Sequence, residues 1–101
     1  MGTRLDLQYL LEAVLGSTNV YFQPPSTVRL KYPCIVYKRI GDNVEYADNS
    51  KYRRLKKYLI TVMDRNPDSL IPDKVSDLPY CEFTNQFKLN NLNHDVFTKY
   101  Y

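Results

Sequence analysis

The sequence predicts a single α+β domain, in which a largely antiparallel sheet is covered on one face by two helices. Three observations support this prediction. A chain of 101 residues suits one domain, spanning residues 1–101. Apolar residues near the start recur at three- and four-residue spacing, as in a helix that packs on a core. Later segments are β-branched and aromatic with two-residue alternation, and a polar connector separates them, as in α+β domains.

The first predicted element is a helix over residues 4–15. Thr3 can cap its start, and Gly16 stands where a glycine commonly ends a helix. A short strand is expected next, at residues 20–22, because the two prolines that follow cannot continue it. The helix has one apolar stripe, formed by Leu7, Leu10, Leu11, Val14 and Leu15.

The middle of the chain predicts a strand at 32–40, with a proline near its start, where strands tolerate one. Gly-Asp-Asn at 41–43 predicts a turn, and residues 44–47 are then expected to begin the return strand. The strongest strand pattern is 52–64, cationic in its first half and apolar on both sides in its second. That second half suits a central strand, with Tyr58, Ile60 and Val62 on one face and Leu59, Thr61 and Met63 on the other.

Residues 65–79 predict a helical connector, with its helix at about 68–78. Asn66 or Asp68 can cap a first turn, and Pro72 can occupy the first position of a second short helix. Two strands complete the chain, at 80–89 and 92–101. In the last strand Leu92, Val96 and Tyr100 alternate with Phe97 and Tyr101.

The sequence carries no constellation that predicts catalysis. His94 is the sole histidine, and its neighbour Asp95 points to the opposite face of a strand, so the pair is no ready-made dyad. A structural, hydrogen-bonded His94 is therefore favoured. Two isolated cysteines and one histidine lack the close pairs of zinc sites. Three glycines far apart cannot form a phosphate-binding loop. We expect no enzymatic activity, no metal and no cofactor.

Composition limits the remaining classes. Cys34 and Cys81 lie in apolar runs, which favours buried free thiols in a reducing compartment over a disulfide. No apolar run approaches the ~20 residues of a membrane span, and no signal peptide is evident. The net charge of +3 permits an acidic partner without requiring nucleic acid. Ten tyrosines without a tryptophan suit a protein whose surfaces meet others.

One basic run, KYRRLKK at residues 51–57, admits two interpretations. Nucleic-acid contact is one of them. The favoured interpretation is a solvated strand end, or a partner-facing edge protected by charge, because the run is short and alternation in a strand would divide its cations between faces. The five cations are Lys51, Arg53, Arg54, Lys56 and Lys57.

Several blocks, in order, resemble the small tail-completion or tail terminator proteins of long-tailed bacteriophages. The resemblance spans about residues 5–101 and is one of pattern, without a catalytic signature. The blocks are NVYFQPP, YPCIVYKR, EYADN, YLITVMDRNPDS, IPDKVSDLPYCEF and NLNHDVFTKYY.

The resemblance implies an α/β subunit that assembles into a ring, commonly a hexamer of identical copies. The ring would cap the growing tail tube, end its polymerisation and offer a surface for joining to the filled head. The implied partners are further copies of itself, the major tail tube protein and the head–tail connector proteins. DNA would pass through the channel without sequence-specific binding, and no membrane is involved. The implied location is the tail of the virion at the head–tail interface, after assembly in the host cytoplasm.

The segment 20–34 is apolar, aromatic and stiffened by prolines, which suits an interface that loses little entropy on binding. The residues of this chain predicted to contact a neighbouring subunit or the tail tube are Tyr21, Phe22, Gln23, Pro24, Pro25, Tyr100 and Tyr101. The alternative is that Tyr21 and Phe22 belong to the domain's own core. The competing functions are a head-side connector or neck component and, less favoured, a small nucleic-acid-binding protein.

Overall fold

A computed structural model describes residues 3–47 and 50–101, with side chains throughout except at 43–47 and 50–55. The chain is α+β, with five strands in the order β1-β2-β3-β5-β4. Only β1 runs parallel to its neighbour, β2; the other pairs are antiparallel. The elements are α1 Arg4–Leu15, β1 Val20–Phe22, β2 Cys34–Ala47, β3 Ser50–Asp64, α2 Ile71–Ser76, β4 Cys81–Leu89 and β5 Leu92–Tyr100.

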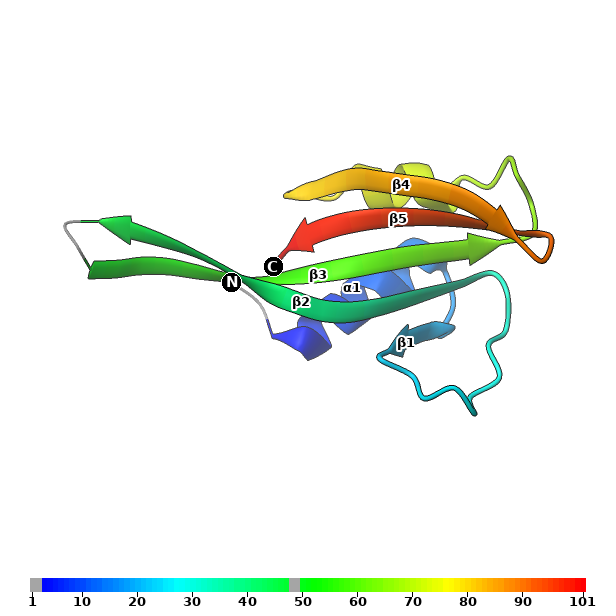
Figure 1. The fold of residues 1–101 in the computed structure, drawn as a ribbon, viewed down its shortest axis with the longest axis horizontal. Helices are drawn as coiled ribbons and strands as arrows, with labels where there is room; N and C mark the ends of the chain where they lie inside the picture. The colour runs from blue at the N-terminus through cyan, green and yellow to red at the C-terminus, as the bar shows by residue number, and fades with distance from the viewer. Residues whose placement is uncertain (1–2, 48–49) are drawn as a thin grey trace.

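Both helices lie on one face of the sheet, behind it in Figure 1. The predicted fold class is therefore confirmed. Between this face and the helices lies one apolar core, in which each fully buried large side chain contributes about 1.5–3 kcal/mol. Its buried members are Leu7, Leu11, Val20, Ile35, Tyr37, Tyr58, Ile60, Val62, Val75 and Phe97.

The boundaries of α1 follow the sequence signals. Thr3 Oγ1 accepts from the amide of Asp6, and the Asp6 carboxylate accepts from the amide of Thr3, each at 3.2 Å. This capping box satisfies two donors that a helix start leaves without a partner. Gly16 ends the helix at φ 81°, a left-handed conformation that costs glycine little, and its amide donates to Glu12 O at 2.8 Å.

The turn predicted at 41–43 is wrong. Those residues continue β2, which runs to Ala47, and β3 begins only at Ser50. A tight hairpin turn requires positive φ, and Gly41 does not adopt it. Instead Gly41 follows a shift in register after Arg39, and Arg39 forms an ion pair with Asp42. Residues 44–47 thus belong to the outgoing strand, not to the return strand.

The second helix is shorter than predicted, Ile71–Ser76 in place of about 68–78. Side-chain turns occupy the residues before it: Asn66 Oδ1 accepts from the amide of Asp68 at 3.0 Å. Such local bonds compete with helix formation. Leu70 precedes the helix without a side-chain cap, and Pro72 takes the second helical position, not the first.

The β2–β3 hairpin makes the molecule long. The molecule measures 50 × 26 × 22 Å, and its radius of gyration of 14.5 Å exceeds the roughly 13 Å of a compact 100-residue domain. In Figure 1 the hairpin projects to the left, beyond the end of the sheet. We call its projecting part, residues 41–47 and 50–56, the arm.

Candidate interaction surfaces

The backbone of the arm pairs only within the arm itself over most of its length. β1 pairs with β2 no further than Tyr37, and β5 pairs with β3 from Lys57 onward. Beyond that point the C-terminus adds one exchange of bonds, in which the amides of Lys56 and Tyr101 donate to each other's carbonyl oxygens at 3.1 and 2.9 Å. In the described part of the chain, residues 50–55 therefore present one backbone edge without a strand beside it.

The base of the arm brings part of the predicted basic segment onto the predicted C-terminal tyrosines. Lys57 Nζ lies 5.9 Å from the centre of the Tyr100 ring, a cation–π distance. Both tyrosines are half-buried, and Tyr101 also packs against the core. The side chains of Lys51, Arg53 and Arg54 lie outside the described residues.

Phe22 and Tyr21 are held within their own domain. The Phe22 ring is half-buried, 5.0 Å from the Tyr37 ring, and the guanidinium of Arg4 lies 4.7 Å over it. The Tyr21 hydroxyl accepts from the amide of Lys31 at 3.4 Å. The two alternatives for Phe22 were an intersubunit contact and a place in the domain's own core. In the structure Phe22 is partly buried and packs against the core.

A polar network, which the sequence did not suggest, anchors the same corner. Arg4 donates to the hydroxyl of Tyr37, and this hydroxyl donates to Gln8 Oε1. Gln8 Nε2 in turn donates to Val20 O at 2.9 Å and to Glu12 at 3.0 Å. The network ties α1 to β1 and β2, and it satisfies a tyrosine hydroxyl at the edge of the core.

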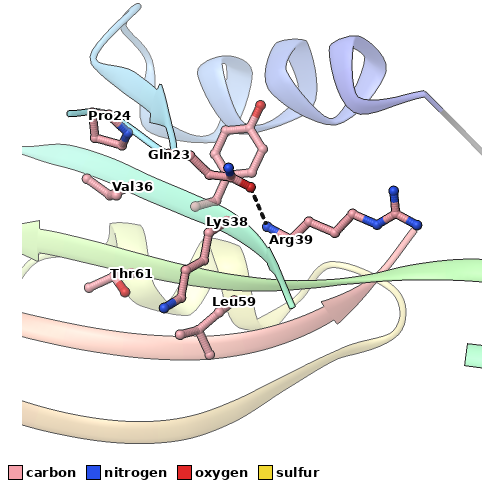
Figure 2. A pocket seen from close by; sticks show the side chains of 8 residues that line it. Gln23, Pro24, Val36, Lys38, Arg39, Leu59 and Thr61 are labelled. Carbon is pink, nitrogen blue, oxygen red and sulfur yellow. Dashed lines mark hydrogen bonds between the residues drawn. The ribbon is translucent and has the colours of Figure 1, made fainter. Parts of the chain in front are cut away.

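The predicted residues Gln23 and Pro24 line a groove of about 590 Å³ on the face of the sheet away from the helices. Gln23 closes one end of it, because its Oε1 accepts from the amide of Arg39 at 3.2 Å, the dashed line in Figure 2. Figure 2 shows Lys38, Leu59 and Thr61 on the side of the sheet opposite α1. Pro25 is exposed on the loop that follows.

The free edge of the sheet at β4 is a surface that the sequence analysis missed. β4 is the terminal strand, paired only with β5, and eight of its nine residues are exposed. Three of these are large and apolar: Phe83, Phe87 and Leu89 are 57%, 43% and 56% exposed. Alternation alone did not reveal this, because it says which residues share a face but not which strand lies at the edge.

An acidic hollow of about 350 Å³ adjoins this edge. Asp68 and Asp73 line it from the α2 segment, Gln86 from β4 and Asp95 from β5. Asp95 is only 8% exposed. Burial raises the pKa of its carboxyl, while a hydrogen bond with Gln86 opposes that shift. Among the described residues, no group of His, Cys, Asp and Glu side chains gathers as a metal site would require.

His94 occupies a packed environment. Its ring stacks on Phe87 with centres 4.6 Å apart and planes inclined by 11°. Its Nδ1–H donates to Leu92 O at 3.1 Å. By register His94 faces the open side of the sheet with Met63, whereas Asp95 faces the helix side with Val62. The two side chains thus point apart, as strand alternation predicted.

Lys99 is the least expected residue of the core, being 1% exposed. Its Nζ donates to Pro79 O at 2.6 Å and lies 5.2 Å from the Tyr101 ring. Burial lowers the pKa of Lys99, and the nearby Cys81 acts in the opposite direction. Its position, two residues after Phe97 on the same strand face, was the available signal.

Both cysteines are free thiols, as predicted. Cys34 is fully buried, and burial, with a smaller contribution from the Asp64 carboxylate, raises the pKa of its thiol to about 11. Cys81 is half-buried at the start of β4, and burial raises the pKa of its thiol as well. A raised thiol pKa favours the unreactive protonated form.

No protein-family model and no curated protein matches this sequence. Neither helix in the described part of the chain has the length and apolar content that crossing a membrane requires.

Proposed function

We propose that this chain is a structural subunit that assembles with copies of itself into a ring on the tail tube of a long-tailed bacteriophage. The ring ends tube polymerisation and presents a surface for joining to the head. One observation carries the assembly role: a two-stranded arm that projects from the sheet with unpaired backbone edges. The resemblance of the sequence blocks to tail terminators supplies the phage context.

An isolated two-stranded ribbon is only marginally stable in water. Open strand edges also invite pairing with other chains, and proteins usually shorten, cover or charge them. This chain charges one edge, with the cations of residues 51–57, but neither shortens nor covers the ribbon, which extends outside its core over residues 41–47 and 50–56. Such an arm is useful when a neighbouring subunit covers it, as in a head-to-tail ring.

The test is tail assembly in cells that express the other tail genes, with and without this chain. We expect tubes of uniform length with the chain, and overlong tubes that fail to join heads without it. A variant whose residues 43–54 are replaced by a short turn should fold and fail to cap tubes. Uniform tubes in the absence of the chain would contradict the proposal.

Fractionation separates the tail-side role from a head-side connector. The chain should co-sediment with purified tubes and not with isolated filled heads. Binding to double-stranded DNA should be weak and without sequence preference, because a channel that grips phosphates strongly would oppose passage of the genome. Co-sedimentation with heads alone would favour the connector function instead.

A further inference from the structure

The free edge of β4 has the properties of a strand that another strand covers. It is nine residues long, it is exposed at eight of them, and it displays Phe83, Phe87 and Leu89. Its only protections are the charges of Glu82 and Lys88 and a register shift after Phe83. A long exposed edge that displays apolar side chains and carries few protecting charges can pair with a further strand.

The surroundings of this edge are acidic. Between Asp64 and Glu82 the chain carries five acidic and two basic residues. Two of the acids, Asp68 and Asp73, are exposed and line the hollow beside Gln86 of β4. A strand that pairs with β4 would therefore gain from positive charge at this place, although each exposed pair contributes modestly.

The arm of this same chain supplies a strand with the matching properties. Residues 50–55 of β3 have one unpaired backbone edge and span about 20 Å at 3.3 Å per residue, which fits within the nine residues of β4. The run 51–57 has five cations and no acidic residue. The opposite arm strand is the poorer match, because Asp42 and Glu45 lie within it.

One molecule cannot make this contact within itself. Figure 1 shows the arm at one end of the molecule and the turn between β4 and β5, with the segment before α2, at the other. β5 also separates β3 from β4 in the sheet. The two surfaces differ from each other and lie on different parts of the subunit, which is the arrangement that generates rings or filaments instead of closed two-fold dimers.

We propose that the free edge of β4 is the docking site for a second copy of this chain, which adds residues 50–55 of its arm to the sheet. This inference rests on the proposed function, because it identifies the contact by which the ring closes. Backbone hydrogen bonds supply the pairing, Phe83 and Phe87 lose water, and the net positive charge of the arm strand lies beside an acidic surface. Each contact is small, so closure of several contacts in one ring gives the stability.

A charge swap between two variants tests the contact. One variant carries Arg53→Glu and Arg54→Glu in the arm; the other carries Asp68→Lys and Asp73→Lys beside β4. Sedimentation should show concentration-dependent association of the wild type in the micromolar to millimolar range, weakened by salt. Each variant alone should associate about tenfold more weakly or worse. Mixing the two should restore association, because every arm then finds a dock of opposite charge.

The control is Arg29→Glu with Lys31→Glu, which changes the charge equally on an exposed loop far from β4 in the sheet. It should associate like the wild type. A wild type that stays monomeric, a control that fails equally, or a mixture that does not recover would each overturn the docking proposal. A two-fold dimer insensitive to arm reversal would also overturn it, in favour of β4 pairing with β4.

A backbone test separates strand addition from charge attraction alone. Thr84 lies at the register shift of β4 and has no paired residue in β5, so proline is tolerable there. Thr84→Pro should keep the folded circular-dichroism spectrum and lose association, while Thr84→Ala should keep both. Equal association of both would overturn strand addition. If the chain caps tubes in the tail assay but the charge-swapped mixture does not recover association, the proposed function stands and this contact is rejected. If the mixture recovers association but the chain does not cap tubes, the contact stands and the proposed function is rejected.

Discussion

β5 and β4 are neighbouring antiparallel strands with similar residue types and opposite environments. Phe97 and Phe83 are paired in register, and their rings meet edge to face at 5.7 Å. Yet Phe97 is 1% exposed and Phe83 57%. Lysines show the same contrast, with Lys99 buried and Lys88 exposed. Moving from β5 to the neighbouring edge strand β4 therefore changes a residue type from one that is buried in the fold to one that is exposed.

The physical cause is coverage from both sides. β5 lies between β3 and β4 and beneath the helices, so its inward side chains are enclosed. β4 has a neighbour on one side only, and α2, six residues long, leaves most of it uncovered. The buried core draws on α1, α2, β1, β2, β3 and β5, whereas β4 is exposed at eight of its nine residues and the arm lies outside the core.

Truncation of the two paired phenylalanines should reveal this difference between β5 and β4 most clearly. Phe97→Ala should lower the free energy of unfolding by about 3–5 kcal/mol, because it empties a closed core site. Phe83→Ala should cost about 1 kcal/mol, chiefly the edge-to-face contact. Urea unfolding at one protein concentration measures both. Equal losses would mean that β4 belongs to the core as much as β5 does.

The sequence predicted much of β3 and α1 and little of what distinguishes β4. The alternation of Tyr58, Ile60 and Val62 against Leu59, Thr61 and Met63 placed β3 at the centre, and register confirms that the first three face the helices. The capping residues placed α1. These signals are local, since each depends on residues a few positions apart.

What the sequence could not predict depends on which strands become neighbours. The exposed edge at Phe83 and Phe87, the enclosure of Lys99 and the hollow beside Asp95 all follow from the order β3-β5-β4. The prediction of a turn at 41–43 failed for a different reason. Gly-Asp-Asn resembles the sequence of a hairpin turn, but here the backbone stays extended through a register shift. Long hairpins tolerate such irregularities without reversing.

The two cysteines extend the comparison to alkaline pH. The pKa of Cys34 is about 11 in the folded chain against an ordinary 9.0, so the folded state keeps a proton that the unfolded state loses. Stability should fall between pH 9 and 11, by on the order of 2 kcal/mol at the upper end. Cys34→Ala should flatten this loss, and Cys81→Ala should flatten it less. Denaturation at several pH values measures the difference; an unchanged slope in Cys34→Ala would contradict the assignment.

The contrast between Lys99 and Lys88 predicts a smaller pH effect on stability, opposite in sign to that of Cys34. The pKa of Lys99 is lowered below 10.5 by burial, so the unfolded chain binds more protons in the interval below that value. The contribution of Lys99 to stability should therefore rise with pH up to about 10.5. Lys99→Met should remove this rise, whereas Lys88→Met, on the exposed strand, should not. Parallel pH profiles of Lys99→Met and the wild type would show that Lys99 is not enclosed in solution.

The smallest effect concerns His94, where β5 and β4 meet on the open face of the sheet. The stacked rings of His94 and Phe87 should contribute about 1 kcal/mol together. His94→Asn and Phe87→Ala should each destabilise the fold slightly, and the double variant should lose less than the sum, because the second change finds the stacking already removed. Additive losses would mean that the rings do not interact in solution.

His94→Asn should also leave tail capping intact, because the described contacts of His94 are a ring and a backbone carbonyl. Complete loss of capping in a folded variant would instead assign His94 a direct role in assembly, and would extend the interaction surface from the β4 edge onto the open face.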